Sequence, residues 1–143
     1  MAKMIFVNLP ISDLQRSTAF YEAIGAEKVE QFCDGTASCM KFSEAIHAML
    51  LTHDKFRQFT PKTIADARTT SEVLICLSAE SREEVDATVA KAAEAGGGAD
   101  PCPKQDYGFM YGRSFEDPDG HIWEVMWMDP AAVEAGPAAY EAA

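Results

Sequence analysis

The segment FEDPDGHIWEV (Phe115–Val125) combines a tight turn with the start of a strand. The turn is Asp117–Gly120, because proline fixes φ while aspartate and glycine tolerate turn conformations. Beyond it, alternation places Trp123 and Val125 on one face of a strand and Glu124 on the other. The segment therefore predicts a hairpin whose last strand has an apolar face packed under a helix and a carboxylate on the opposite face.

Outward from this hairpin, the same order of elements occurs twice along the chain. Each half has an alternating strand (4–10, 72–78), a helix capped by serine and ended by glycine (Ser12 to Gly25, Ser81 to Gly96), and three strand-like runs (27–33, 36–43 and 45–52; 99–104, 109–116 and 121–128). Two copies predict two βαβββ modules in an α+β fold. We expect odd-numbered residues of the first, fourth, fifth and eighth strands to face the helices.

The modules, at about 3–52 and 71–129, form a single domain over residues 1–129. The linker between them, 53–70, is long for a compact domain, and such loops are usually functional or contain a short helix. The acidic, alanine-rich tail, 130–143, is expected to fray or to dock weakly.

The composition excludes several classes of partner. A net charge of −11 over 143 residues argues against nucleic acid and against anionic membrane surfaces. No apolar run approaches the roughly 20 residues that span a bilayer. The four cysteines form no CxxC pair and the N-terminus has no signal-peptide pattern, so we expect a cytoplasmic protein with free thiols.

Two segments carry a family resemblance. LPISDLQRSTAFYEAIGAEKV (Leu9–Val29) resembles the first strand–helix unit of the glyoxalase/bleomycin-resistance/extradiol-dioxygenase (vicinal oxygen chelate) superfamily, and Phe115–Val125 resembles its final hairpin. The resemblance covers about residues 3–129, and the subgroup it resembles most is that of the predicted lactoylglutathione lyases. It implies curved mixed sheets around a concave cleft, and a homodimer.

The resemblance also implies where a metal would bind. In metal-using members, four His, Gln or Glu side chains point into the cleft, and the corresponding positions here are Phe6, Leu50, Leu74 and Glu124. A single carboxylate does not hold a catalytic divalent ion against water. We therefore expect no metal site and no cofactor, and an apolar cleft formed by these residues.

Glu124 is the candidate catalytic residue. A carboxylate among apolar neighbours has its pKa raised by desolvation, as a general acid or base requires. The alternative is pairing with Arg113, which an even-length turn would place across the hairpin from Glu124 and which could instead bind an anionic ligand group.

Further candidate ligand contacts surround the cleft. Asn8 shares the parity of Phe6, Tyr111 belongs to an aromatic and glycine-rich segment, and His53 ends a strand beside the linker.

Two functions follow as alternatives. The first is binding of a small molecule without metal. The second is a glyoxalase-type lyase or isomerase that uses Glu124 as acid or base, or holds a metal with an unconventional ligand set. The apolar residues expected on the open sheet, Phe6, Leu50 and Leu74, also favour a homodimer.

Overall fold

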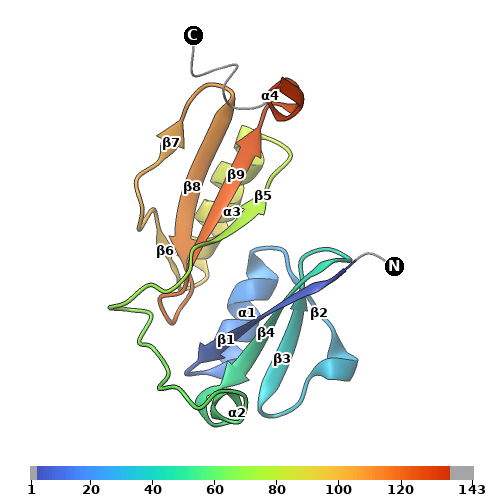
Figure 1. Cartoon of the computed structure of the whole chain (residues 1–143), viewed down its shortest axis with the longest axis vertical. Helices are drawn as coiled ribbons and strands as arrows, with labels where there is room; N and C mark the ends of the chain where they lie inside the picture. Colours follow the sequence, from blue (N-terminus) through green and yellow to red (C-terminus); the bar gives the residue numbers. More distant parts are fainter. Residues whose placement is uncertain (1–2, 136–143) are drawn as a thin grey trace.

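The structure is a computed structural model that describes residues 3–135. The elements, in chain order, are β1 (Ile5–Ile11), α1 (Leu14–Ala23), β2 (Glu27–Lys28), the 3-10 helix η1 (Glu30–Phe32), β3 (Ala37–Lys41), β4 (Ile46–Thr52), α2 (His53–Arg57), β5 (Ile75–Ser78), α3 (Arg82–Glu94), β6 (Gly98–Ala99), β7 (Gln105–Asp106), β8 (Met110–Glu116), β9 (Ile122–Met128) and α4 (Pro130–Ala135). The two modules follow one another along the longest axis, and the linker runs beside their junction (Figure 1). The predicted α+β fold is confirmed.

Each module forms its own mixed sheet. The first sheet has the strand order β1-β4-β3-β2, and the second has β5-β9-β8-β6, with β7 also paired to β8. In each sheet the module's first and last long strands are parallel, while the other pairs are antiparallel. Helix α1 packs on β3 and β4, and α3 packs on β8 and β9. In these strand orders, β1 and β5 are edge strands of their sheets.

The register of β4 differs from the prediction. Leu9 of β1 pairs with Leu50 of β4, and both lie in the core beneath the helices. Partners in a sheet share a face, so the even-numbered residues of β4 face the helices and Met49 faces the cleft side. The odd-number rule holds in β1, β5 and β9, where Ile75 pairs with the buried Trp123. The prediction that odd-numbered residues face the helices is wrong for β4. The prediction that Leu50 lines the cleft is therefore wrong as well.

One hydrophobic core joins the modules. Phe20 and Tyr21 of α1 pack with Phe115 and Trp123 of the second module in a single cluster of buried residues. Gly97 of the second module packs tightly against α1, because a Cβ there would lie 2.6 Å from the Phe20 ring, as well as 2.1 Å from the Glu116 carbonyl oxygen of its own module. One buried cluster thus includes residues of both modules, although their sheets are separate.

The N-terminal caps of α1 and α3 agree only in part with the prediction. Ser81 caps α3 as predicted, accepting a hydrogen bond from the Glu84 backbone N–H at 3.1 Å. Helix α1 is capped by Asp13, not by Ser12. Ser12 instead donates its hydroxyl and backbone N–H to the Asp119 carboxylate at 2.7 and 3.0 Å. A residue that looked like a cap therefore binds the turn of the other module.

Several short elements depart from the expected pattern. The run predicted as a strand at 27–33 is β2 followed by η1, and the run at 99–104 gives way to the short strands β6 and β7. The linker begins with α2. The tail begins with α4, in which Ala132 is buried, and the rest of it lies outside the described residues. Within residues 3–135, no helix has the length and apolar character needed to cross a membrane.

Candidate functional site at the module junction

The face of the first sheet opposite α1 presents aromatic and thioether side chains. Phe6 pairs with His47, and Asn8 pairs with Met49. The Phe6 ring stacks on the His47 imidazole, with centroids 4.6 Å apart and planes inclined by 17°. His47 is buried, and its Nδ1 has no hydrogen-bond partner among residues 3–135. Phe6 and Asn8 therefore lie on the predicted face, but Leu50 does not.

The corresponding face of the second sheet carries Glu124. It is half-buried, between Cys76 of β5 and Ser114 of β8. Burial, and then the charge of Glu124, raises the pKa of the Cys76 thiol above its usual value. The Ser114 hydroxyl accepts a hydrogen bond from the Cys102 backbone N–H at 3.0 Å. Glu124 thus has a thiol and a hydroxyl as its strand neighbours.

Arg113 does not lie opposite Glu124, so that prediction is wrong. The turn between β8 and β9 has an odd number of residues, which shifts the pairing by one and places Arg113 opposite Val125. Its guanidinium points to the helix side and holds Asp100 through Nε at 3.0 Å and Nη2 at 2.6 Å, and Asp86 through Nη1 at 2.9 Å. The hydrogen bonds from Arg113 lower the pKa of Asp100. Arg113 ties β8 to α3 and does not face the cleft.

Tyr111 also lies on the helix side, opposite Trp127. Its hydroxyl donates to Asp86 at 2.6 Å, and the Arg82 guanidinium lies 4.9 Å from its ring centroid and 5.3 Å from that of Trp127. The expectation that Tyr111 lines the concave face is corrected for the same reason as for Arg113. A one-residue change of register moves both side chains to the opposite face.

The donor set does not fit the metal that the family resemblance implies. Phe6 and Leu74 have no lone pairs, and Met49, which takes the place expected for Leu50, offers only a thioether. Within the part of the chain that the structure describes, no three His, Cys, Asp or Glu side chains are grouped so that they could hold an ion. Divalent catalytic sites need about three protein donors, so we derive no chemistry through a metal.

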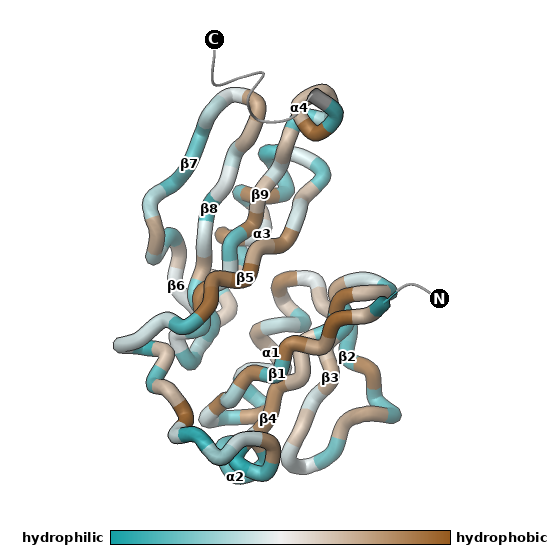
Figure 2. The backbone as a smooth tube through the Cα atoms, viewed as in Figure 1, coloured by the Kyte–Doolittle hydropathy of each residue, from teal (hydrophilic) through white to brown (hydrophobic). Residues whose placement is uncertain are grey.

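A pocket of about 470 Å³ lies at the junction of the two modules, and we call it the junction pocket. Its walls come from β1 (Val7 to Pro10), from Val73 before β5 and Ile75 at its start, from Gly120 to Ile122, and from the linker, including Phe56 and Ile64. The edge strands β1 and β5 are hydrophobic where they border it (Figure 2). Its polar groups include Asn8, Lys62, Glu72 and His121. Ligand pockets commonly combine such a volume with apolar walls and a few polar groups.

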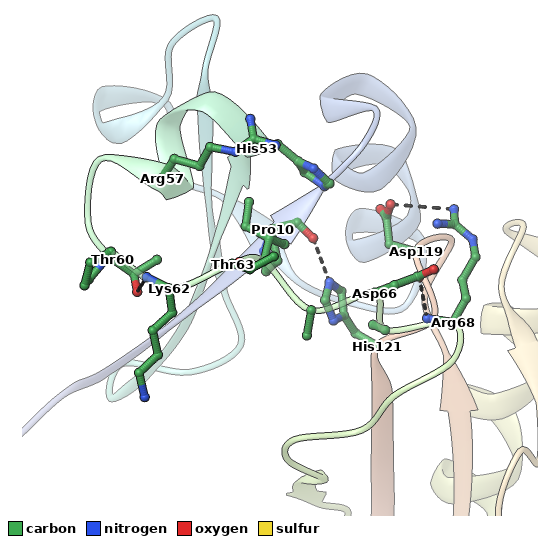
Figure 3. A pocket seen from close by; sticks show the side chains of 14 residues that line it. Pro10, His53, Arg57, Thr60, Lys62, Thr63, Asp66, Arg68, Asp119 and His121 are labelled. Carbon is green, nitrogen blue, oxygen red and sulfur yellow. Dashed lines mark hydrogen bonds and ion pairs between the residues drawn. The ribbon is translucent and has the colours of Figure 1, made fainter.

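A second pocket, of about 620 Å³, lies under the linker and shares part of its lining with the first; we call it the linker pocket (Figure 3). His53, at the start of α2, extends into it beside Pro10 and Asp119 (Figure 3). The Arg68 guanidinium lies 3.8 Å from the Asp119 carboxylate and donates to the Pro118 carbonyl at 3.2 Å. Arg57 pairs with Asp54 at 2.9 Å.

His121 borders both pockets and is held by the backbone. Its Nε2 lies 2.7 Å from the Pro10 carbonyl oxygen, and because a carbonyl only accepts, Nε2–H is the donor. In the neutral ring Nδ1 is then an acceptor. Gly120 beside it has φ +93°, and a Cβ there would meet the Ala67 carbonyl at 2.9 Å. The turn thus fixes both the imidazole and the path of the linker.

The structure gathers only some of the predicted site residues. Asn8 lines the junction pocket and His53 the linker pocket, whereas Leu74 is exposed just before β5, outside both linings. Lys62 and His121 were not predicted as site residues. The only sequence signal near them was the unusual length of the linker. Their positions could not be predicted, because the linker packs over the turn between β8 and β9 through contacts between residues far apart in sequence.

The comparisons with known proteins identify the family to which these paired βαβββ modules belong. The chain belongs to the Glyoxalase/Bleomycin resistance protein/Dioxygenase superfamily, whose family model matches residues 3–125. None of the curated proteins matches it significantly.

Solved structures show the same fold. A hypothetical protein from S. aureus is 27% identical, with a TM-score of 0.74 over 89% of this chain and 95% of that one. A glyoxalase/bleomycin resistance protein/dioxygenase family enzyme from Burkholderia phytofirmans is 19% identical, with a TM-score of 0.71 over 89% and 99%. A glyoxalase-related enzyme from Fulvimarina pelagi is 22% identical, with a TM-score of 0.71 over 89% and 88%.

Proposed function

We propose that this chain is a metal-free member of the superfamily that binds a small organic molecule in the junction pocket. The observation that carries the proposal is the pocket itself, about 470 Å³, in which apolar side chains from β1, β5 and the linker lie beside polar ones. A ligand enclosed there would remove the side chains of Val73 and Ile75 from water, which provides most of the affinity in such sites.

The poor metal donor set supports binding over metal-dependent chemistry. The cysteines Cys33, Cys39, Cys76 and Cys102 are free, which supports the further proposal of a reducing, cytoplasmic setting.

A second candidate is an enzyme of the lactoylglutathione lyase-like subgroup that uses Glu124 as acid or base. The observation that favours it is the half-buried position of Glu124 beside Cys76 on the concave face. For this function, Glu124→Gln would lower turnover by roughly 10²–10⁴-fold. For the binding function, the same substitution would leave ligand affinity in the junction pocket nearly unchanged.

The binding proposal is tested by isothermal titration calorimetry with naphthalenemethanol and naphthoate as apolar probes. We expect wild-type protein to bind at least one of them, at one site per chain. Val73 lines the junction pocket and is 57% exposed, so Val73→Trp should fill the pocket without disturbing the core and should abolish the binding.

The matched control is Val133→Trp, because Val133 is 64% exposed on α4 and lines neither pocket. It should bind the probe as the wild type does. If neither probe binds, or if Val73→Trp binds as well as Val133→Trp, the junction pocket is not the ligand site.

A further inference from the structure

We infer that the ligand of the junction pocket is a small organic acid with one acidic group, recognised by Lys62. This inference rests on the proposed function and specifies its ligand class. The walls of the pocket combine apolar side chains with hydroxyl, amide and charged groups, and Lys62 is the one Lys or Arg side chain among its lining residues. An apolar molecule with a single anionic end matches that combination.

The other Lys and Arg residues that line the linker pocket, Arg57 and Arg68, are already paired. Arg57 is held by Asp54, and Arg68 by Asp119 and the Pro118 carbonyl. The Lys62 ammonium, by contrast, has no ion-pair or hydrogen-bond partner among residues 3–135. A ligand acid would therefore bind Lys62 without first breaking a protein ion pair.

The direction of the Lys62 side chain fits this role. In Figure 3 it extends away from His53 and Asp119, and Lys62 lines the junction pocket as well as the linker pocket. Asn8 of β1 lines the junction pocket as well, and its amide has no partner in the described part of the chain. Lys62 and Asn8 together provide N–H donors for a carboxylate.

The local charge matters because the rest of the chain repels anions. At a net charge of −11, long-range attraction does not bring an acid to this protein. An acid is retained only by a contact at short range, and because Lys62 is exposed, added salt should weaken this contact. Lys62 provides this contact at the pocket.

Glu72 limits the ligand to one acidic group. It is the only carboxylate among the residues that line the junction pocket, and it lies at the β5 end of the linker while Lys62 follows α2. A second acid on the ligand would meet this carboxylate and be repelled. The pocket therefore selects monoacids over diacids.

The test compares three naphthalene probes by calorimetry: uncharged naphthalenemethanol, the monoacid naphthoate and a naphthalenedicarboxylate. Wild-type protein should bind naphthoate most tightly. Lys62→Gln should weaken naphthoate roughly tenfold, the worth of one charge-assisted hydrogen bond, and leave naphthalenemethanol unchanged. Lys91→Gln, at an exposed lysine of α3, is the matched control and should change neither affinity.

Glu72→Gln should raise the affinity for the dicarboxylate more than that for naphthoate. If naphthoate binds no tighter than naphthalenemethanol, and Lys62→Gln changes neither, the acid inference is wrong while the binding function stands. If Glu72→Gln leaves the dicarboxylate unaffected, the selection against diacids is wrong. If no probe binds to wild-type protein, the proposed function itself fails.

Discussion

The Tyr21 hydroxyl of α1 donates a hydrogen bond to the Asp117 carboxylate of the opposite module at 2.7 Å and accepts one from the Trp123 indole N–H at 2.9 Å. All three groups are buried. Burial raises the pKa of Asp117, and burial together with the charge of Asp117 raises the pKa of Tyr21. The two sequence segments that carry the family resemblance therefore bind each other directly, and this contact joins the two modules.

Removing the Tyr21 hydroxyl should destabilise the whole domain. In Tyr21→Phe, one oxygen of the buried Asp117 carboxylate loses its donor and the Trp123 N–H loses its acceptor. We expect the free energy of unfolding, measured by urea denaturation, to fall by about 2–4 kcal/mol, because buried polar groups left without partners are costly.

The control for this variant is Tyr107→Phe, because Tyr107 is 61% exposed. It should change the free energy of unfolding by less than about 0.5 kcal/mol, as surface substitutions usually do. Equal effects of the two variants would show that the buried contact between the modules contributes nothing specific.

The register of β4 predicts opposite outcomes for neighbouring substitutions. Leu50 is fully buried in the core, so Leu50→Arg places a charge there and should cost about 3–5 kcal/mol or prevent folding. Met49 lies on the opposite face and is only partly buried, so Met49→Arg should remain folded. Circular dichroism during thermal unfolding measures both, and the reverse ranking would contradict the register.

Asp100 should link stability to acid pH. Its pKa is lowered by the Arg113 hydrogen bonds, so it contributes stability above its unfolded-state value of about 3.8, and this contribution is lost as pH falls through the lower folded-state pKa. Asp100→Asn should therefore be less stable at neutral pH and lose less stability on acidification below pH of about 4.

Asparagine suits this test because Asp100 has φ 54°, a conformation that asparagine also adopts. Melting temperatures measured across acid pH check the expectation. Glu30→Gln, which removes an exposed carboxylate, should leave the wild-type profile unchanged. A profile for Asp100→Asn parallel to that of the wild type would contradict the account of the Arg113 pair.

We also expect a homodimer. Met4, Ile5, Phe6, Val73 and Leu74 are all about half exposed at or near the starts of the edge strands β1 and β5. Soluble monomers rarely leave such apolar surface in water. Light scattering at micromolar concentration should give twice the chain mass, and Phe6→Glu combined with Leu74→Glu should give a monomer. A monomeric wild type would show that this apolar surface has another role.

Periodicity was enough to predict the modules, the two long helices and the faces of β1, β5 and β9. Trp123 and Val125 were placed correctly because a strand repeats every two residues whatever its partners are. The same rule failed for β4, because its parity relative to β1 depends on where the strand enters the sheet.

The site was harder to predict, for a reason that Arg113 and Lys62 illustrate. Placing Arg113 required the exact length of the turn after β8, and an error of one residue moved it from the cleft to the helix side. Lys62 lies in an irregular linker that has no periodicity, and its place at the pocket depends on long-range contacts such as that of Gly120 with Ala67. Neither the strand register that places Arg113 nor the contact between Gly120 and Ala67 can be recognised from the neighbouring sequence.

The central claim, that a small molecule binds at the module junction, is tested most directly by amide NMR spectra of wild-type protein titrated with naphthoate. The account predicts that the largest shifts fall at Asn8, Val73, His121 and the linker amides around Lys62, and that they saturate at one probe per chain. Saturating shifts confined to the strand amides of Cys39, Met49 and Ser114, with none at the junction, would contradict it.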